Sequence, residues 1–338
     1  MKLNSVFVCV LSSIMLFSSV CHAAHDKVLE KIRTRGTVYC GTNRNDGDLA
    51  YKDEEGIWRG FDASLCRAIA AAVLGDKERF EMKPIRIDSV PQALKSGAID
   101  VMFGEFALPA ETEITSNVLN MDVLYYEKIM ILAHKKEGAT SLEAYKGSQV
   151  CLVTNSIDTY YFNNFIYKYN LKLQPIYYPT RDRAIEGFYL NRCDLLPGAS
   201  NELKTILNTK MKGKSYVELI PETIGLRPVY LMIDKDSLKL GITVKWIINA
   251  LRLAETYDIN SNNLPMMIGD KDPSIQNLLG NQPRLWKKFS VYPKWMRKYI
   301  AEEGNFREIY ERYLGPGTSV DLNSPEPEKG LAIPKPFI

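Results

Sequence analysis

The segment at residues 96–113 constrains the fold of this chain most, because it predicts a helix end, a buried strand and a loop in succession. Gly97 is a typical residue for ending a helix. Residues 99–102 then form a short, mostly apolar run, which is typical of a strand that a parallel sheet covers on both faces. Because ligands of open α/β sheets bind beyond the carboxyl ends of such strands, we expect residues 104–112 to border a binding site.

A similar unit recurs further along the chain. Residues 183–190 have the pattern of a helix, a turn follows, and residues 193–196 begin a strand. Residues 96–100 align with residues 190–194. The repetition favours two similar lobes that each send a strand into one shared cleft, and a chance likeness is the alternative.

Two apolar, β-prone stretches at residues 125–134 and 225–234 divide the chain. A lobe inserted between two such crossover strands makes a hinged pair, and 338 residues are enough for two domains. We therefore predict lobe 1 from residues 24–130 and 229–338, and an inserted lobe 2 from residues 135–225.

Helical periodicity predicts several helices in lobe 1. Asp62 is placed to cap a helix at residues 63–74, and another helix is expected at residues 293–302 with its proline in the first turn. The tail at residues 325–338 is rich in proline and is expected to be extended.

Composition and charge exclude several classes of protein. The content is 46% hydrophobic and 25% charged, which is typical of a folded domain. The net charge of +3 is spread along the chain and by itself argues neither for nor against nucleic acid, which is not an expected partner. There is no phosphate-binding loop and no Gly-x-Gly-x-x-Gly, so we expect no nucleotide and no other cofactor.

The first residues have the pattern of a secretion signal. Lys2 is followed by an apolar core at residues 6–20, and Ala23 completes a small-residue cleavage site, so residues 1–23 are expected to be removed. A membrane anchor is less favoured because the apolar run is short and rich in serine. We expect a periplasmic protein.

Four cysteines remain after that cleavage: Cys40, Cys66, Cys151 and Cys193. In an exported protein they imply disulfides, and four cysteines allow three pairings. Only the pairing Cys40–Cys66 with Cys151–Cys193 keeps each bridge inside one predicted lobe. The absence of Cys-x-x-Cys argues against zinc, and no metal is expected.

Motifs spread over the chain resemble the periplasmic general amino-acid-binding proteins of ABC importers. The likeness runs from about residue 28 to the end at matching spacing, and it is carried by residues 35–41, 56–62, 66–68, 94–101, 150–151, 192–194, 279–280 and 304–312. The resemblance implies an α/β, two-lobed periplasmic-binding-protein type 2 fold, with each lobe a sheet flanked by helices and two crossover strands as the hinge. It also implies a monomer that passes a small polar solute, such as an amino acid, to an ABC permease in the inner membrane.

The ligand chemistry of that family is where this sequence departs from it. The family holds the α-carboxylate of its ligand with an arginine, and that position is Thr112 here. Nearby family threonines and serines fall on Glu105, Phe106, Ala107 and Pro109, and a stacking aromatic residue falls on Leu49.

The lobe 2 partners in the family differ as well. The aspartate that pairs with the α-ammonium corresponds to Ala199, and a Gly-Thr-Thr helix start corresponds to Asn155-Ser156-Ile157. The loss of one buried charge partner would cost an amino-acid ligand about 3–5 kcal/mol. The loss of both predicts that ordinary amino-acid binding is abolished, unless Arg44, Arg181 or Arg183 replaces the missing arginine.

Two further hypotheses remain. The same fold could bind a different solute, cationic or neutral, or a protein partner. The polar residues for such a solute would be Asp48, Glu105, Asn155, Ser156 and Asp158, although for each of them singly a solvated loop is the favoured interpretation. Alternatively the chain could be an enzyme, but His25 and His134 are the only histidines after the signal. Glu105 with Glu111 could be a carboxylate pair for acid–base work, although two acids in one loop are more often solvated. We expect no enzymatic activity.

Overall fold

The computed structural model describes residues 27–42, 49–104, 110–139, 141–315, 322–323 and 334–336, with the side chains of residues 110–112 excluded. The first part of the described chain contains α1 (Lys27–Arg35), β1 (Val38–Thr42), β2 (Tyr51–Lys52), β3 (Trp58–Arg59), α2 (Phe61–Leu74), β4 (Phe80–Pro84), η1 (Ile87–Ser89), α3 (Val90–Ser96), β5 (Val101–Gly104) and α4 (Ala110–Thr115). The middle part contains β6 (Val118–His134), η2 (Leu142–Tyr145), β7 (Gln149–Val153), α5 (Ile157–Lys168), β8 (Gln174–Tyr178), α6 (Arg181–Tyr189), β9 (Leu195–Ala199), α7 (Ser200–Asn208) and β10 (Val217–Asp234).

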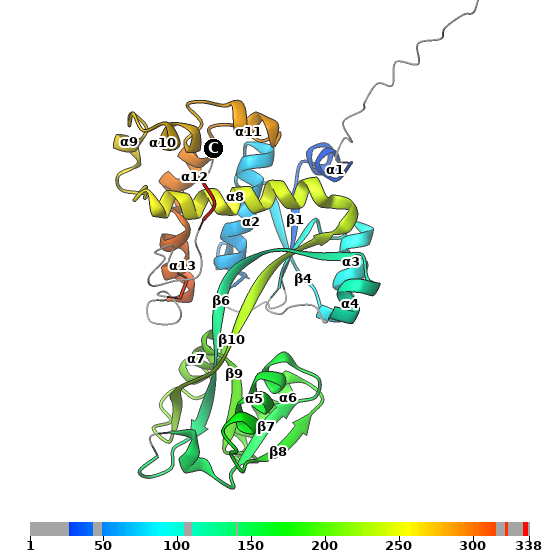
Figure 1. Ribbon diagram of the computed structural model, residues 1–338, viewed down its shortest axis with the longest axis vertical. Helices are drawn as coiled ribbons and strands as arrows, with labels where there is room; N and C mark the ends of the chain where they lie inside the picture. Colours follow the sequence, from blue (N-terminus) through cyan, green and yellow to red (C-terminus); the bar gives the residue numbers. More distant parts are fainter. Residues whose placement is uncertain are drawn as a thin grey trace, which may run out of the picture.

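The last part is helical. It contains η3 (Lys235–Ser237), α8 (Leu238–Thr256), α9 (Leu264–Met267), α10 (Pro273–Leu278), α11 (Arg284–Lys288), α12 (Trp295–Glu303) and α13 (Phe306–Leu314). All of these helices pack in lobe 1, around α2 (Figure 1).

One sheet passes through both lobes. Its order is β4-β1-β5-β10-β6-β9-β7-β8, so the long antiparallel pair β6 and β10 stands at the centre. These two strands run from lobe 1 into lobe 2 and are the crossover strands (Figure 1). The predicted two-lobed α/β fold is confirmed, with the addition that the sheets of the two lobes are continuous through β6 and β10.

The hydrophobic core follows this division. One large cluster lies in lobe 1 between the sheet and α2, α8, α12 and α13, with Phe61 at its centre against the rings of Tyr125, Phe306 and Tyr310. In lobe 2 the strand alternation of β6 separates two clusters. Ile129, Ile131 and Ala133 face the cluster under α5, whereas Met130 and Leu132 face the cluster under α6 and α7.

The repeated unit of the sequence forms the same local structure in each lobe. The Asp100 backbone N–H donates to the Tyr39 carbonyl at 2.8 Å, and the Asp100 carboxylate accepts the Tyr39 N–H at 2.8 Å. Asp194 makes the same two bonds with Gln149, at 2.8 and 2.9 Å. In both lobes the aspartate thus fixes the start of a strand beside its parallel neighbour.

Both disulfides have the expected pairing. Cys40 in β1 is bonded to Cys66 in α2, and Cys151 in β7 is bonded to Cys193 before β9. Each bridge therefore joins elements within one lobe.

Some local expectations were wrong. Asp62 does not cap α2: it lies inside the first turn, buried, and its carboxylate accepts a hydrogen bond from Thr42 Oγ1 at 2.9 Å. The residue at the cap is Gly60, because a Cβ there would collide with the Leu49 backbone. The helix expected from Pro293 begins at Trp295, and most of the predicted extended tail lies outside the described residues.

Removal of either disulfide is predicted to lower stability. The cysteines are 26 and 42 residues apart, so in the chain-entropy model the bridges contribute about 3.5 and about 4 kcal/mol. We expect Cys40→Ala/Cys66→Ala and Cys151→Ala/Cys193→Ala each to lower the free energy of unfolding by at least these amounts, measured by guanidinium titration. Unchanged midpoints in both variants would contradict a structural role for the bridges.

Candidate functional site

The strand directions define where the two lobes face each other. Strand β10 runs from lobe 2 to lobe 1, and β5 is antiparallel to it, so the carboxyl ends of β5 and its parallel neighbour β1 point toward lobe 2. Strand β9 is antiparallel to β6, so the carboxyl ends of β9 and β7 point toward lobe 1. Ligands of α/β sheets bind at such ends, and the interlobe region, between these four strand ends, is therefore the candidate site.

The start of α5 forms one wall of the interlobe region. Ser156 caps the helix, and its hydroxyl accepts the Thr159 N–H at 3.1 Å. The Thr159 hydroxyl in turn donates to the Val153 carbonyl at 2.8 Å. Asn155 has a φ of 58°, a left-handed conformation that asparagine tolerates. These interactions fix the loop after β7, so Asn155 and Ser156 both lie where the sequence places them, with Ser156 acting as a helix cap.

Asp158 is held by an arginine of the crossover strands. Arg227 of β10 contacts Glu127 of β6 at 2.6 Å and Asp158 at 3.2 Å, and the Arg227 and Glu127 side chains are each only 4% exposed. Arg227 and Glu127 are direct partners in the β6–β10 ladder. This buried trio, Glu127–Arg227–Asp158, therefore joins both crossover strands to the first turn of α5.

The start of α7 has a different chemistry. Ala199 is fully buried, precedes α7 without a side-chain cap, and pairs with Ile129 of β6. Lys128 is the next residue along β6, and α7 packs on this strand. Burial lowers the pKa of the Lys204 ammonium, and the positive charge of Lys128 on the strand that α7 packs against lowers this pKa further.

This lysine pair, Lys128 and Lys204, has no ion-pair partner within the part of the chain that the structure describes. Side chains alternate along a strand, so Lys128 lies on the opposite face of β6 from Glu127. The crossover strands thus separate a carboxylate-rich trio on the α5 side from a purely cationic pair on the α7 side.

Lobe 1 contributes an apolar and a polar feature. Leu49 is 7% exposed and belongs to the lobe 1 core, and its carbonyl accepts the Asp62 N–H at 2.9 Å. The bonded pair of Thr42 and Asp62 lies at the carboxyl end of β1. The other predicted residues of this lobe, Asp48, Glu105 and Ala107, together with Arg44, lie outside the described residues, as does the Thr112 side chain.

The two described arginines of lobe 2 that could replace a missing ligand arginine are both paired. Arg181 is bonded to Glu202 at 2.7 Å and to the Pro197 carbonyl at 2.8 Å. Arg183 is exposed and bonded to Glu186 at 2.7 Å. Each guanidinium already has a carboxylate partner in its own lobe.

The fold and the interlobe region define a class of two-lobed binding proteins. The family model for bacterial extracellular solute-binding proteins, family 3, matches residues 38–316. The chain belongs to this family and is a solute-binding protein.

Curated relatives are similar over nearly their whole length. The chain is 26% identical to the glutamate/glutamine/aspartate/asparagine-binding protein BztA of Rhodobacter capsulatus, over 96% of this chain and 97% of the relative. It is 24% identical to the general L-amino acid-binding periplasmic protein AapJ of Rhizobium johnstonii, over 89% of this chain and 88% of the relative.

Solved structures share the fold. An ABC transporter/periplasmic binding protein from Brucella ovis with glutathione bound superposes with a TM-score of 0.81, at 24% identity, covering 92% of this chain and 99% of the other. No helix among the described residues is long and apolar enough to span a membrane. Within the same residues, no group of three or more His, Cys, Asp or Glu side chains could hold a metal ion.

His134, the described histidine weighed for catalysis, lies away from the interlobe region. It ends β6 in lobe 2 and stacks on Phe188, with ring centroids 4.2 Å apart. Burial lowers the pKa of its imidazole.

Sequence reasoning missed the buried trio and the lysine pair. A usable signal was present, because Glu127, Lys128 and Arg227 are charged residues inside apolar, β-prone stretches. Charged side chains in a central strand need partners or a ligand, since burial of an unpaired charge is costly. They carry no motif, so only the fold shows which side chains they meet.

Arg227→Met is predicted to destabilise the protein by about 3–5 kcal/mol, because Glu127 would keep a buried charge without this partner. The measurement is the free energy of unfolding. Arg183→Met, which breaks an exposed pair, is the control and should change stability by less than about 1 kcal/mol. Adding Glu127→Gln to Arg227→Met should recover part of the lost free energy of unfolding. If Arg227→Met lowers this free energy as little as Arg183→Met does, the role of the trio is contradicted.

Stability is also predicted to depend on His134 in mild acid. The folded-state pKa is below the ordinary value of 6.5, so the unfolded chain binds the proton first, and stability falls as the pH drops below about 6.5. We expect His134→Gln to reduce the loss of stability between about pH 7 and pH 5. Unfolding titrations at these pH values measure the free energy of unfolding of the unmodified protein and of His134→Gln. If this free energy depends on pH in the same way in both proteins, the prediction is contradicted.

Proposed function

We propose that this protein captures a small solute with an acidic group between its lobes and delivers it to an ABC permease in the inner membrane. The observation that carries the proposal is the lysine pair at the start of α7. Ordinary zwitterion recognition needs an acid for the α-ammonium, and the corresponding position is the buried Ala199. The described cations near that position instead favour an anionic group.

The geometry around α7 supports an anion. Ser200 and Lys204 are four residues apart in α7 and so lie on the same face of the helix. Lys128 immediately precedes Ile129, the partner of Ala199, on the neighbouring strand. The Ser200 hydroxyl oxygen is buried and has no hydrogen-bond partner among the described residues. Two ammonium groups, a hydroxyl and the positive end of a helix dipole are suited to a carboxylate or phosphate.

The relatives fit this class of solute. The name of the Rhodobacter capsulatus relative includes glutamate and aspartate beside the neutral amides glutamine and asparagine, and the Brucella ovis structure contains glutathione. Glutamate, aspartate and glutathione each carry at least one carboxylate beyond the α-amino acid carboxylate. We infer that this feature, rather than a free zwitterion, is what the α7 side of the site recognises.

Lobe closure would complete the site. We infer that residues 24–130 with 229–338 and residues 135–225 move as two bodies about β6 and β10. The β6–β10 register shifts between Ile220 and Gly225 and again between Val229 and Tyr230, and such irregularities interrupt the ladder where bending is easiest. Export by cleavage after Ala23 would place the protein in the periplasm, where an inner-membrane permease is accessible.

A binding screen tests the proposed solute class. The probes are L-glutamate, glutarate, glutathione, L-glutamine and L-arginine, measured by isothermal titration calorimetry. We expect acidic probes to bind and glutarate to bind comparably to glutamate, because the α-ammonium lacks its usual partner. The proposal would be contradicted if L-arginine or L-glutamine binds and the acidic probes do not. If none of the five probes binds, a protein partner or a solute of another class is favoured.

Substitutions that remove the charges of the lysine pair test whether these two residues bind the acidic solute. We expect Lys128→Gln/Lys204→Gln to weaken the acidic solute at least about thirtyfold, equivalent to ~2 kcal/mol for two charged hydrogen bonds. Lys210→Gln/Lys212→Gln removes the same charge from exposed positions after α7 and should leave the affinity unchanged. Equal affinity of the two double variants would show that the lysine pair does not contact the solute.

A further inference from the structure

A second concave site lies in lobe 1, away from the interlobe region. A cavity of about 610 Å³ lies between the end of α2 and the segment that leads into α12. Because β1 runs toward lobe 2 and α2 returns from it, the last turn of α2 lies at the far end of lobe 1 (Figure 1). A ligand in this cavity would therefore not occupy the space between the lobes.

Tight backbone contacts build the walls of the cavity. Gly75 ends α2 with a φ of 73°, and a Cβ there would lie only 2.9 Å from the Tyr292 ring. The Tyr292 backbone N–H donates to the Ala72 carbonyl at 2.8 Å. On the other side, a Cβ on Gly280 would collide with the Pro293 carbonyl. The cavity is thus a built part of lobe 1 and not a gap between loosely packed loops.

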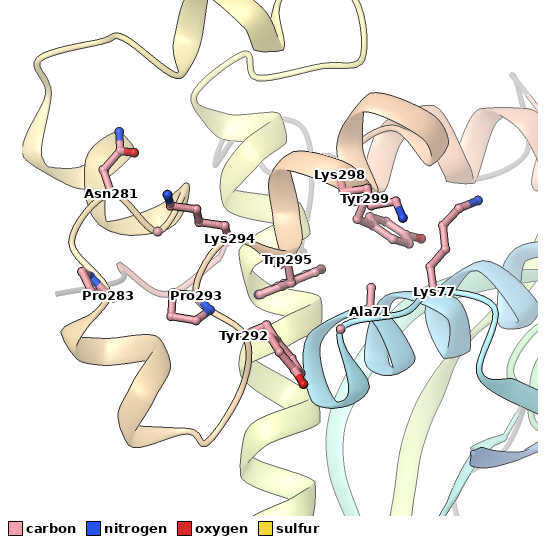
Figure 2. A pocket seen from close by; sticks show the side chains of 12 residues that line it. Ala71, Lys77, Asn281, Pro283, Tyr292, Pro293, Lys294, Trp295, Lys298 and Tyr299 are labelled. Carbon is pink, nitrogen blue, oxygen red and sulfur yellow. The ribbon is translucent and has the colours of Figure 1, made fainter. Parts of the chain in front are cut away.

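One wall of the cavity is aromatic. Trp295 and Tyr299 are 4% and 0% exposed, with ring centroids 5.9 Å apart, whereas the residue Tyr292 is 55% exposed. Figure 2 shows Tyr292 beside the end of α2 and next to Trp295. The Tyr299 hydroxyl donates to the Ser64 carbonyl at 2.7 Å, so its polar end is already satisfied. Because Trp295 and Tyr299 are buried, the exposed Tyr292 is the part of this wall that an apolar or aromatic body can contact.

The charges around the cavity are positive. The lining contains Lys77, Lys294 and Lys298 and, among the described residues, no acidic side chain. Lys77 is neutralised by Glu303 and Glu78, each at 3.0 Å, and by Glu302. Lys294 and Lys298 lie one turn apart at the start of α12, and neither makes an ion pair within the described chain.

We propose that this cavity is a second binding site, for a small amphiphilic anion whose apolar or aromatic body packs on Tyr292 and whose acidic group is attracted by the positive charges of Lys294 and Lys298. These two lysines point to opposite sides of Trp295 in Figure 2. The volume is in the range of small-molecule sites, which are mostly apolar with few polar groups that orient the ligand. A carboxylate on a planar body fits this combination of aromatic wall and unpaired ammonium groups. The proposal does not depend on which solute the interlobe region takes.

The probe for this site is 2-naphthoate, measured by isothermal titration calorimetry on the full mature chain, with 2-naphthamide as its uncharged match. We expect the carboxylate to bind at least about tenfold more tightly than the amide. Lys294→Gln/Lys298→Gln should weaken the carboxylate about tenfold, and Tyr292→Ala, which removes an exposed ring, should weaken both probes about fivefold.

Two matched variants distinguish binding in this cavity from binding elsewhere on the protein. Lys287→Gln/Lys288→Gln removes the same charge from exposed positions on α11, and Lys128→Gln/Lys204→Gln removes it from the interlobe region. Both should bind 2-naphthoate as the unmodified protein does. The proposal would be overturned if 2-naphthoate does not bind or if 2-naphthamide binds equally well. It would also be overturned if only Lys128→Gln/Lys204→Gln loses binding, because the probe would then lie between the lobes.

Discussion

The antiparallel pairing of β6 and β10 is the constraint on which the rest of this molecule depends. These strands carry one sheet from lobe 1 into lobe 2, and the other six strands of this sheet lie on either side of them, three in each lobe. Arg227 and Glu127 face each other in this ladder and are nearly fully buried. Because Asp158 also contacts Arg227, the charge balance of the crossover strands positions the first turn of α5, one wall of the interlobe region.

The two faces of β6 and β10 carry different charged groups. On the α5 side, carboxylates and a guanidinium satisfy each other, whereas on the α7 side the lysine pair faces no acid among the described residues. Buried and half-buried charges require compensation, and the compensation can come from the protein or from a ligand. In this account the trio is structural, and we propose that the lysine pair contacts the acidic group of the solute.

Much of the architecture could be predicted from the sequence because local signals agree with the fold. Gly97 ends α3 in a left-handed conformation, and the aspartates of the repeated unit, Asp100 and Asp194, start equivalent strands. Asp62 was misread because a helix-start pattern does not show that the chain enters α2 through Gly60, under the Leu49 backbone. The lysine pair could not be predicted, because only the packing of α7 on β6 puts Lys128 and Lys204 on neighbouring elements.

The most direct test of the central claim is a crystal structure of the protein with a bound acidic solute, such as glutarate or glutathione. We expect a carboxylate oxygen of the solute within hydrogen-bond distance of the Lys128 and Lys204 ammonium groups, with Arg227 still bonded to Glu127 and Asp158. A solute held instead by an arginine at its carboxylate and by an acidic side chain at its ammonium, far from the lysine pair, would contradict the account.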